Sequence, residues 1–384
     1  MVTLLAAPSE TDVFVIGGGP AGLAAAIAAR RRGFEVTVAD RRRPSFDKAC
    51  GEGLMPDAVS ALRQLGVELS HEHGTPFRGI RFLDSERIAE ASFVSRDKWG
   101  LGIRRTQLHR ILVEHASDAG VALRWESEID GLDPIGVKLN GSLVRCRWII
   151  GADGFHSRVR RWAGLSPVWR GVRRIGVRQH FRVRPWSEFV EVYWNSHCQA
   201  YVTPVSPDDV CVAIIGRAHE LRLSDLPTLF PALANRLGHA NPTDSWRGAI
   251  SMCVKLPTVT EGRIALVGDA SGSIDAVTGQ GLAMAFQQAN SLATAIAVGD
   301  LRQYEAVHRQ LGLMPRLMAH LLLLMDGHDG LRRRVLRALA AYPGAFSRLL
   351  AVHVGESHPS GLSLEVLVYV LRLFETHPLV PRRA

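Results

Sequence analysis

The sequence predicts an α/β fold with a second part of α+β type, and three observations lead to this prediction. A glycine-rich loop near the N-terminus lies between a short apolar run and an alanine-rich segment, which is typical of a strand–loop–helix unit. Strand-like runs between residues 173 and 216 are separated by turn residues, which indicates an antiparallel sheet. From residue 311 onward, apolar residues alternate with arginines at helical spacing, which predicts a helical C-terminal region.

The N-terminal unit begins with a buried-strand run from Val13 to Ile16. The glycine-rich loop at residues 17–22, GGGPAG, satisfies the pattern GxGxxG. An alanine-rich helix follows and ends near Gly33, and a second strand, Glu35 to Ala39, leads to Asp40. Because strand, loop, helix, second strand and acidic residue occur at the expected spacing, this segment predicts a dinucleotide-binding site.

Each part of this unit has a mechanical role toward a dinucleotide. Gly17 permits a tight turn, Gly19 lets the backbone approach a pyrophosphate, and Gly22 lets the helix pack closely on the strand. The helix N-terminus presents free N–H groups and a partial positive charge to phosphates. Asp40 can accept hydrogen bonds from ribose hydroxyls. This unit alone does not distinguish FAD from NAD.

Two later segments carry further fingerprints. Residues 149–161 read IIGADGFHSRVRR, which contains the pattern DGxxSxxR after an apolar strand. Residues 262–285 contain a buried-strand run that ends in Gly268-Asp269, and Gly281 then opens a long helix. With GxGxxG, DGxxSxxR and GD in this order, the chain resembles the para-hydroxybenzoate hydroxylase-fold flavoproteins. That group includes class A flavin monooxygenases, flavin-dependent halogenases and geranylgeranyl reductases.

The resemblance implies a Rossmann-like FAD-binding domain interleaved with an antiparallel-sheet substrate domain, followed by a helical cap. The implied domains are residues 1–75, 100–165 and 255–310 for FAD, residues 76–99 and 166–254 for substrate, and residues 311–384 for the cap. FAD is the expected cofactor. Because a second GxGxxG is absent from the sequence, NADPH or NADH is expected as a transient electron donor, with a separate reductase as the alternative.

The resemblance also implies roles for single residues. Asp269 is expected at ribityl or pyrophosphate groups, and the backbone at Gly281 and Leu282 is expected at the flavin N1/C2 edge, where a helix N-terminus favours reduced flavin. Arg105 is expected to reach the FAD phosphates and Ile129 to lie against adenine; an exposed helix arginine and an ordinary strand residue are the alternatives. The expected cofactor-binding residues are Gly17, Gly19, Pro20, Ala21, Gly22, Asp40, Arg41, Lys48, Cys50, Arg105, Ile129, Asp153, Asp269, Gly279, Gly281 and Leu282.

The segment DKACGEGLMP, residues 47–56, raises a question about Cys50. In the family that the chain resembles, this segment crosses close to the isoalloxazine ring, and Gly51 and Gly53 let the backbone lie against a flat cofactor. We therefore expect Cys50 to contact the flavin side, with a packing residue and a redox or nucleophilic thiol as the alternatives. Lys48 alone is a modest activator of a thiol.

The sequence suggests few residues for the reaction itself. The catalytic candidates are Cys50 and, on the predicted substrate sheet, His180 and Tyr193. Strand alternation places His180 with Arg178 and Arg182 on one face, which is either the pocket face or a solvent face. The sequence shows no metal-ligand spacing, so no metal site is expected.

The resemblance leaves several activities open. The segments GVRQHF, PWSEFVEVYW and AYVTPV resemble bacterial tailoring flavoproteins and favour hydroxylation of an aromatic, polyketide or phenolic-lipid substrate. The segments TGQG, before the long helix, and KACGEGL, which contains Cys50, resemble the geranylgeranyl reductase branch. Reduction of a carbon–carbon double bond in an isoprenoid is therefore the alternative. Halogenation is disfavoured because the GxWxWxIP segment is absent from the sequence. A non-catalytic flavin-fold binding protein is the second alternative.

The amino-acid composition indicates which kinds of molecule the protein is expected to bind. The net charge is +9, but only four of the 46 basic residues are lysines, and the sequence shows neither a basic stripe nor a nucleic-acid-binding module. We therefore expect no nucleic acid and a small, apolar or aromatic substrate. The C-terminal helices are expected to be a packed cap, with a membrane or lipid contact as the alternative.

The sequence also bears on location. The five cysteines form no CxxC pair, and the N-terminal segment shows no secretory signal pattern. No stretch reaches the roughly 18 apolar residues of a membrane span. These features favour a cytoplasmic protein, with membrane association as the alternative.

Overall fold

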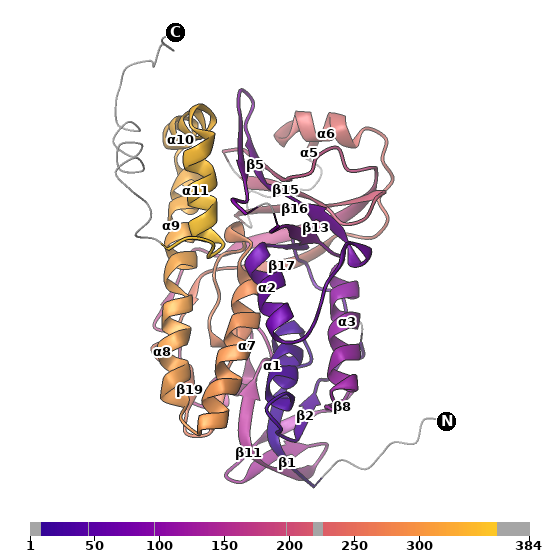
Figure 1. The fold of residues 1–384 in the computed structure, drawn as a ribbon, viewed down its shortest axis with the longest axis vertical. Helices are drawn as coiled ribbons and strands as arrows, with labels where there is room; N and C mark the ends of the chain where they lie inside the picture. The colour runs from indigo at the N-terminus through magenta and orange to yellow at the C-terminus, as the bar shows by residue number, and fades with distance from the viewer. Residues whose placement is uncertain (1–8, 45, 96, 197, 218–225, 359–384) are drawn as a thin grey trace.

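The computed structural model describes residues 9–44, 46–95, 97–196, 198–217 and 226–358 of the 384-residue chain. Within these residues the chain forms two large sheets with helices packed on both (Figure 1). This architecture confirms the predicted α/β fold class with an α+β second part. The N-terminal residues 1–8 and the predicted helical stretch near residues 363–374 lie outside the described residues.

The first sheet has eight strands and a mostly parallel centre. Its path runs β19-β20-β11-β1-β2-β8, and β10 and β9 extend it antiparallel from β11. Strand β1 pairs in parallel with β11 and β2, and β11 pairs in parallel with β20. The strands are β1 (Glu10–Ile16), β2 (Val36–Ala39), β8 (Ala122–Arg124), β9 (Ile129–Asp133), β10 (Gly136–Leu139), β11 (Ser142–Gly151), β19 (Thr260–Glu261) and β20 (Ile264–Leu266). The predicted apolar run at residues 13–16 is fully buried, as expected for a central parallel strand.

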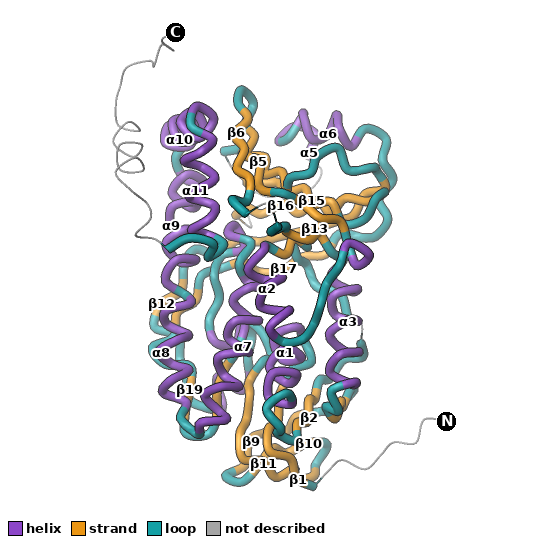
Figure 2. Tube along the Cα trace, in the orientation of Figure 1, coloured by secondary structure: helices purple, strands orange, loops and turns teal. Residues whose placement is uncertain are grey.

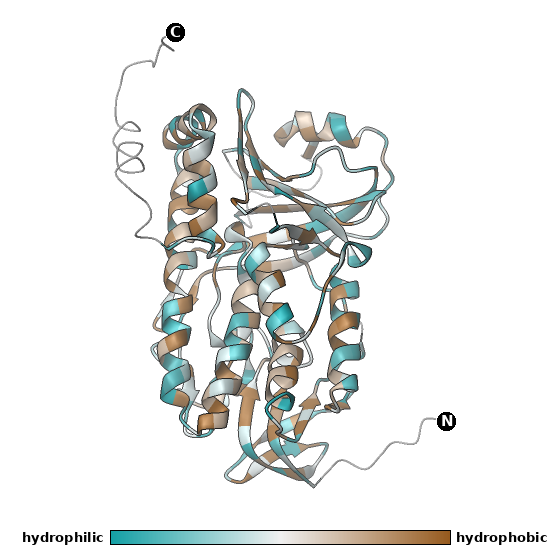
Figure 3. Ribbon diagram, viewed as in Figure 1, coloured by the Kyte–Doolittle hydropathy of each residue, from teal (hydrophilic) through white to brown (hydrophobic). Residues whose placement is uncertain are grey.

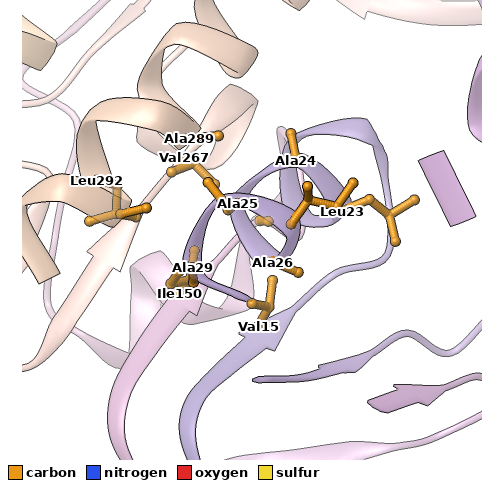
Figure 4. Close-up of a cluster of buried hydrophobic side chains, with 14 of the residues drawn as sticks. Val15, Leu23, Ala24, Ala25, Ala26, Ala29, Ile150, Val267, Ala289 and Leu292 are labelled. Carbon is orange, nitrogen blue, oxygen red and sulfur yellow. The ribbon is translucent and has the colours of Figure 1, made fainter. Parts of the chain in front are cut away.

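Helix α1 (Pro20–Arg30) packs on this sheet beside α7 (Gly281–Val298). Figure 4 shows small α1 side chains such as Ala25 and Ala29 between strand residues Val15 and Ile150 and the α7 residue Leu292. Because alanine adds little bulk, the two helices and the strands approach closely and exclude water. Helix α3 (Arg105–Asp118) packs against α1, whereas α2 (Pro56–Gln64) and α8 (Leu301–Leu311) pack against α7.

The second large sheet has seven strands in the order β17-β13-β16-β15-β14-β5-β6. Its strands are β5 (Gly79–Leu83), β6 (Ile88–Ser92), β13 (Arg174–Arg182), β14 (Val190–Trp194), β15 (Cys198–Pro204), β16 (Asp209–Arg217) and β17 (Arg247–Ser251). The strands predicted between residues 173 and 216 pair antiparallel, as expected, whereas β5, which was not among the predicted runs, pairs in parallel with β14. The two strands come from separate chain segments, so no hairpin turn dictates their direction.

The described residues also form two small sheets. One contains β3 (Gly53–Leu54), β7 (Gly100–Gly102) and β4 (Thr75–Phe77), and the other pairs β12 (Trp169–Arg170) with β18 (Val254–Lys255). Strand β3 directly follows the glycine-rich segment that contains Cys50, so this segment is anchored at its C-terminal end by sheet pairing.

Helices cover both faces of the second sheet (Figures 2 and 3). Helices α9 (Leu313–Gly327), α10 (Asp329–Ala341) and α11 (Pro343–His353) share one apolar core with Val192 of β14. Helices α5 (Leu226–Leu229) and α6 (Pro231–Leu237) share a separate core with Tyr193, the next residue along that strand. Because neighbouring strand residues point to opposite faces, the two cores lie on opposite sides of the sheet.

None of the helices in the described part of the chain is, taken singly, both long and apolar enough to cross a bilayer. Helices α10 and α11 meet the length and composition criteria only when taken together, and the chain bends by 106° between them.

Candidate functional site

A cavity of about 1370 Å³ is lined by elements of both large sheets and by the C-terminal helices. All residues that the sequence assigned to the cofactor line this cavity except Gly22. Among the catalytic candidates, Cys50 lines it, whereas His180 and Tyr193 are absent from its wall. The structure therefore gathers the three separate sequence fingerprints around one space.

The glycines of the first motif differ in what surrounds them. A Cβ atom on Gly22 would lie 1.9 Å from the carbonyl oxygen of Gly17, so this glycine is required for the close approach of helix and loop. A Cβ atom on Gly17 would lie 2.4 Å from the carbonyl oxygen of Ala152, and Gly17 has a φ of +112°. A Cβ atom on Gly19 would meet nothing within 4 Å, because this residue faces the cavity.

Two helix N-termini open onto the cavity. Gly19 precedes α1 and Gln280 precedes α7, and neither helix start receives a side-chain cap. Gly279 holds a left-handed conformation at the turn before α7, and a Cβ atom on Gly281 would meet open space. Uncapped N–H groups and the positive ends of two helices suit a ligand with two separated anionic regions. The pyrophosphate and the reduced ring of FAD are such regions, so these residues fit FAD.

Asp40 is buried at the end of β2, as its position in the sequence predicted. Its carboxylate accepts hydrogen bonds from the backbone N–H groups of Gly18, at 2.8 Å, and Arg42, at 2.9 Å. These bonds fix the carboxylate at the cavity wall beside the glycine loop. Each oxygen keeps a lone pair, so the contact with a ribose hydroxyl stays a prediction.

The DG fingerprint, residues 153–160, stabilises its own loop by hydrogen bonds and contacts the segment that follows the GD fingerprint, Gly268-Asp269. Asp153 accepts from the backbone N–H groups of Arg158, at 2.6 Å, and Val159, at 3.1 Å, through one oxygen. Ser157 caps the same helix, α4 (Arg158–Trp162), by accepting from the Arg160 N–H. The Arg160 guanidinium donates to the carbonyl oxygen of Ala270 at 3.1 Å. Asp153 therefore shapes the cavity wall, and its second oxygen is buried without a hydrogen-bond partner among the described residues.

Two residues expected at the cofactor pair with each other. The Lys48 ammonium lies 3.1 Å from the carboxylate of Asp269, and both side chains are partly exposed. This pair links the segment that contains Cys50 to the GD fingerprint. Arg105 starts helix α3 and Ile129 starts strand β9, and both line the cavity.

Cys50 lies half-buried on the cavity wall. Its Sγ accepts from the backbone N–H of Glu52 at 3.4 Å, and its carbonyl oxygen lies 3.7 Å from the thiol of Cys211. Burial raises the pKa of the Cys211 thiol well above its usual range, so that neighbour stays a neutral donor. Cys50 thus lines the cavity, and its contact with the flavin side stays a prediction.

The structure places the other two catalytic candidates elsewhere. Tyr193 faces the core beneath α5 and α6 and donates a 2.7 Å hydrogen bond to Glu191, and burial raises its pKa. The candidate role of Tyr193 in the cavity is therefore wrong, because strand alternation turns it to the opposite face from Val192. His180 is 1% exposed, so the alternative of a solvent face is wrong for it, whereas Arg182 is exposed.

His180 instead belongs to a buried polar network that the sequence did not indicate. Its Nε2 lies 2.6 Å from Glu52, and its Nδ1 lies 2.7 Å from Asp244. Arg178 bonds both Asp244 and Asp47. Glu52 stands between two glycines and Asp244 in a turn-rich stretch, so neither carries a sequence pattern that identifies it.

Glu52, His180 and Cys211 bring ligand-type atoms within 4.8 Å of one another. The oxygen and nitrogen of this group already form a direct hydrogen bond, and the Arg178 guanidinium lies 3.8 Å from the same carboxylate. A nearby positive charge opposes a metal cation. The described contacts thus account for this cluster as a hydrogen-bonded network.

The far end of the cavity is apolar. Side chains from α9, α10 and α11 face side chains from β5 and β14 there; examples are Phe82, Val192, Leu322, Leu339 and Phe346. The sequence predicted a helical cap but not that its helices line the cavity. A capping helix and a pocket wall have the same amphipathic pattern.

Two titratable groups lie where this apolar end meets the start of α7. Tyr201 donates to the carbonyl oxygen of Val277 at 3.0 Å, and burial raises its pKa above the usual value. His353 bonds the carbonyl oxygen of Thr278 at 3.0 Å through Nε2, and burial lowers its pKa. Because a carbonyl only accepts, Nε2 carries a proton, and the lowered pKa favours the neutral ring. Both residues hold the turn that precedes α7.

Comparison with known proteins places these features in a family. A model of the FAD binding domain matches residues 10–299. A probable 2-heptyl-3-hydroxy-4(1H)-quinolone synthase of Rhodococcus erythropolis is 27% identical over 78% of this chain and 83% of its own length. A digeranylgeranylglycerophospholipid reductase of Methanosarcina acetivorans is 26% identical over 71% of both chains. Rifampicin monooxygenase of Rhodococcus hoagii is 25% identical over 85% of this chain and 74% of its own.

The fold has close counterparts among solved structures. A flavoprotein/dehydrogenase of Cytophaga hutchinsonii superposes with a TM-score of 0.80 over 94% of this chain and 98% of its own, at 18% identity. The family model covers most of the chain, and the glycine loop, the DG and GD fingerprints and the two uncapped helices surround one cavity. The chain therefore belongs to the FAD binding domain family and is an FAD-dependent oxidoreductase.

Proposed function

We propose that the protein is a monooxygenase that hydroxylates an aromatic ring carrying an apolar chain. The observation that carries this proposal is the apolar compartment that continues from the cofactor site between the second sheet and helices α9 to α11. An aromatic head group fits beside the start of α7, and the compartment accepts an alkyl or polyketide chain. The relatives named as a heptyl-quinolone synthase and a monooxygenase support this substrate class and this reaction.

A bound FAD, once reduced by NADPH or NADH, would supply the chemistry that transfers one oxygen atom of dioxygen to the substrate and converts the other to water. The protein supplies binding, orientation and a dry compartment. Tyr201 and His353 hold the turn before α7, and the apolar side chains of the compartment exclude water. Burial keeps the Tyr201 hydroxyl protonated and makes the His353 ring a weaker base, so neither group is expected to take the substrate proton, and the substrate hydroxyl is expected to bind as a hydrogen-bonding partner.

Reduction of a carbon–carbon double bond is the second candidate. The same apolar compartment suits an isoprenoid chain, and one relative is named as a digeranylgeranylglycerophospholipid reductase. The KACGEGL and TGQG segments, which resemble the geranylgeranyl reductase branch, both contribute residues to the cavity wall and support this candidate.

The two reactions differ in whether they require dioxygen and in the mass that the product gains. We would incubate the FAD-loaded protein with NADPH, and separately NADH, and with phenols bearing alkyl chains or with polyprenyl lipids, in air and under argon. A gain of one oxygen atom that occurs only in air supports the monooxygenase. A gain of two hydrogen atoms under argon supports the reductase instead, and flavin that is reduced only by dithionite points to a separate reductase as the donor.

A substitution in the compartment tests where the substrate chain binds. Leu322→Trp fills apolar space on α9 that lies beyond the cofactor end. We expect kcat/KM for a long-chain substrate to fall at least about tenfold, since a misfit of about 1.4 kcal/mol is sufficient. A short-chain analogue and the FAD dissociation constant serve as controls. An equal loss for both substrates would contradict chain binding in this compartment.

A further inference from the structure

The flavin-side loop, defined as residues 47–52, is tied to other parts of the molecule by its charged residues. Asp47 pairs with Arg178 of β13 and, at 2.8 Å, with Arg247 of β17. Lys48 reaches the GD fingerprint on the opposite side, and Glu52 contacts β13 again through His180. The loop is thus held from both sides, although its own residues include no regular secondary structure.

Glu52 is the most constrained residue of this loop. It has a φ of +59°, a conformation that a residue with a Cβ atom rarely adopts, and its side chain is 1% exposed. Both carboxylate oxygens are engaged: one accepts from the backbone N–H of Arg105 at 2.8 Å, and the other lies 2.6 Å from His180. A strained backbone persists only where its surroundings hold it, and these two contacts do so.

His180 connects Glu52 to the protein surface. Its ring is buried, and each ring nitrogen faces a carboxylate, Glu52 at one end and the partly exposed Asp244 at the other. Arg178 lies beside the ring, with one guanidinium nitrogen 3.1 Å from Nδ1. A buried carboxylate is stable only with partners of opposite charge or hydrogen-bond donors. Arg178 and His180 are such partners for the loop.

We infer that Glu52 and His180 are positioning residues that hold the flavin-side loop, and with it Cys50, against the FAD ring. The inference rests on the FAD site and applies equally to hydroxylation and to double-bond reduction. The chain Glu52–His180–Asp244 fixes the loop from the substrate sheet, and Lys48 fixes it from the FAD side. Loss of either Glu52 or His180 releases the loop while both sheets stay folded.

Thiol labelling reports the loop position directly. We would measure the rate at which N-ethylmaleimide labels Cys50, resolved by peptide mass spectrometry, in protein with and without FAD. In the FAD-bound protein, where the ring would cover the cavity side of Cys50, Glu52→Gln and His180→Asn are expected to raise this rate at least about tenfold, because opening of the loop then limits labelling. The buried Cys146 of the first sheet is an internal reference, since its labelling reports global unfolding.

A matched control separates the loop effect from general destabilisation. Glu191 is an equally buried carboxylate of the second sheet, but it pairs with Arg81 and contacts no loop residue in the described contacts. Glu191→Gln should leave the Cys50 rate within about twofold. Asp244→Asn, at a partly exposed site, gives a milder variant if His180→Asn does not fold, and Asp244→Glu should restore the slow rate.

The FAD dissociation constant, followed by flavin fluorescence, provides a second readout. We expect it to rise several-fold in Glu52→Gln and His180→Asn but not in Glu191→Gln. Unchanged labelling of Cys50 and unchanged FAD affinity in folded loop variants would overturn the inference. Because neither measurement depends on turnover, a failed substrate assay leaves this test intact.

Discussion

At the scale of single residues, two glycines of the first motif are expected to have different roles. Gly22 is needed for the fold, whereas Gly19 is needed for cofactor binding. A Cβ atom on Gly22 would collide with Gly17, whereas one on Gly19 would enter the open cavity. Gly19→Ala should therefore change the free energy of unfolding of the FAD-free protein by less than about 1 kcal/mol. The same methyl group would occupy the approach of a pyrophosphate to α1, so we expect FAD affinity to fall at least about tenfold.

Gly22→Ala is the contrasting variant. Its Cβ atom has no room at 1.9 Å from a carbonyl oxygen, so thermal unfolding without FAD should occur at a clearly lower temperature. Titration calorimetry with FAD and thermal denaturation of both variants measure the two effects. If Gly19→Ala binds FAD as tightly as the unmodified protein, the pyrophosphate does not lie at this helix start.

At the scale of elements, the sequence predicted local units well and long-range contacts poorly. The strand–loop–helix unit around residues 13–40 and the long helix that Gly281 opens, α7, follow from local pattern and spacing, and the structure contains them. The parallel pairing of β14 with β5 has no local signal, because the partner strand lies about a hundred residues earlier in the sequence. Sequence alternation placed His180 and Arg178 on one face but did not indicate which element covers that face.

Helix α9 carries an exposed apolar stripe of four leucines. Leu313, Leu317, Leu321 and Leu324 recur at helical spacing and are 64%, 50%, 46% and 40% exposed. Leu321 and Leu324 also line the cavity, so the stripe continues from the surface to the proposed substrate compartment. We propose that this stripe contacts a lipid surface from which an apolar substrate enters.

Two of these leucines allow a direct test. Leu313→Ser combined with Leu317→Ser should lower co-sedimentation with phosphatidylglycerol-containing vesicles at least about tenfold, since each buried leucine contributes about 1.5–3 kcal/mol. Both side chains lie outside the cavity wall, so activity on a detergent-dispersed substrate should persist. The pair Val168→Ser and Val172→Ser, equally exposed near β12, is the control. Equal loss in both pairs would show that α9 has no special role in lipid binding.

At the scale of the whole molecule, the cavity is formed by segments that are far apart in the sequence, and no local sequence pattern predicts that they meet. Cys50 and the residues of the GD fingerprint were predictable because motifs carry them, and they line one cavity. Glu52 and His180, 128 positions apart, meet only when the second sheet closes over the flavin-side loop. Tyr193 was placed wrongly for the related reason that a strand has two faces, and only packing against α6 shows which one is turned away.

The dependence of stability on pH tests how α8 is joined to the GD fingerprint. His308 of α8 is buried and lies 3.0 Å from the hydroxyl of Ser271, which donates to the carbonyl oxygen of Gly268. Burial, aided by the charge of Arg316, lowers the pKa of His308 from 6.5 to about 4. The folded protein therefore keeps this ring neutral in a pH range where the unfolded chain takes up a proton.

This difference sets the sign of the effect. As pH falls from 6.5 to 4, proton uptake by the unfolded state lowers the free energy of unfolding, by about 3 kcal/mol at most for this group. His308→Gln keeps a hydrogen-bonding side chain but cannot titrate, so urea unfolding should show a smaller loss of stability between pH 7 and pH 4. His320→Gln, at an exposed position on α9, should leave the slope unchanged. If the free energy of unfolding falls with pH equally in His308→Gln and in the unmodified protein, His308 takes up protons in the folded state. The contact between His308 of α8 and Ser271 beside the GD fingerprint would then open in solution.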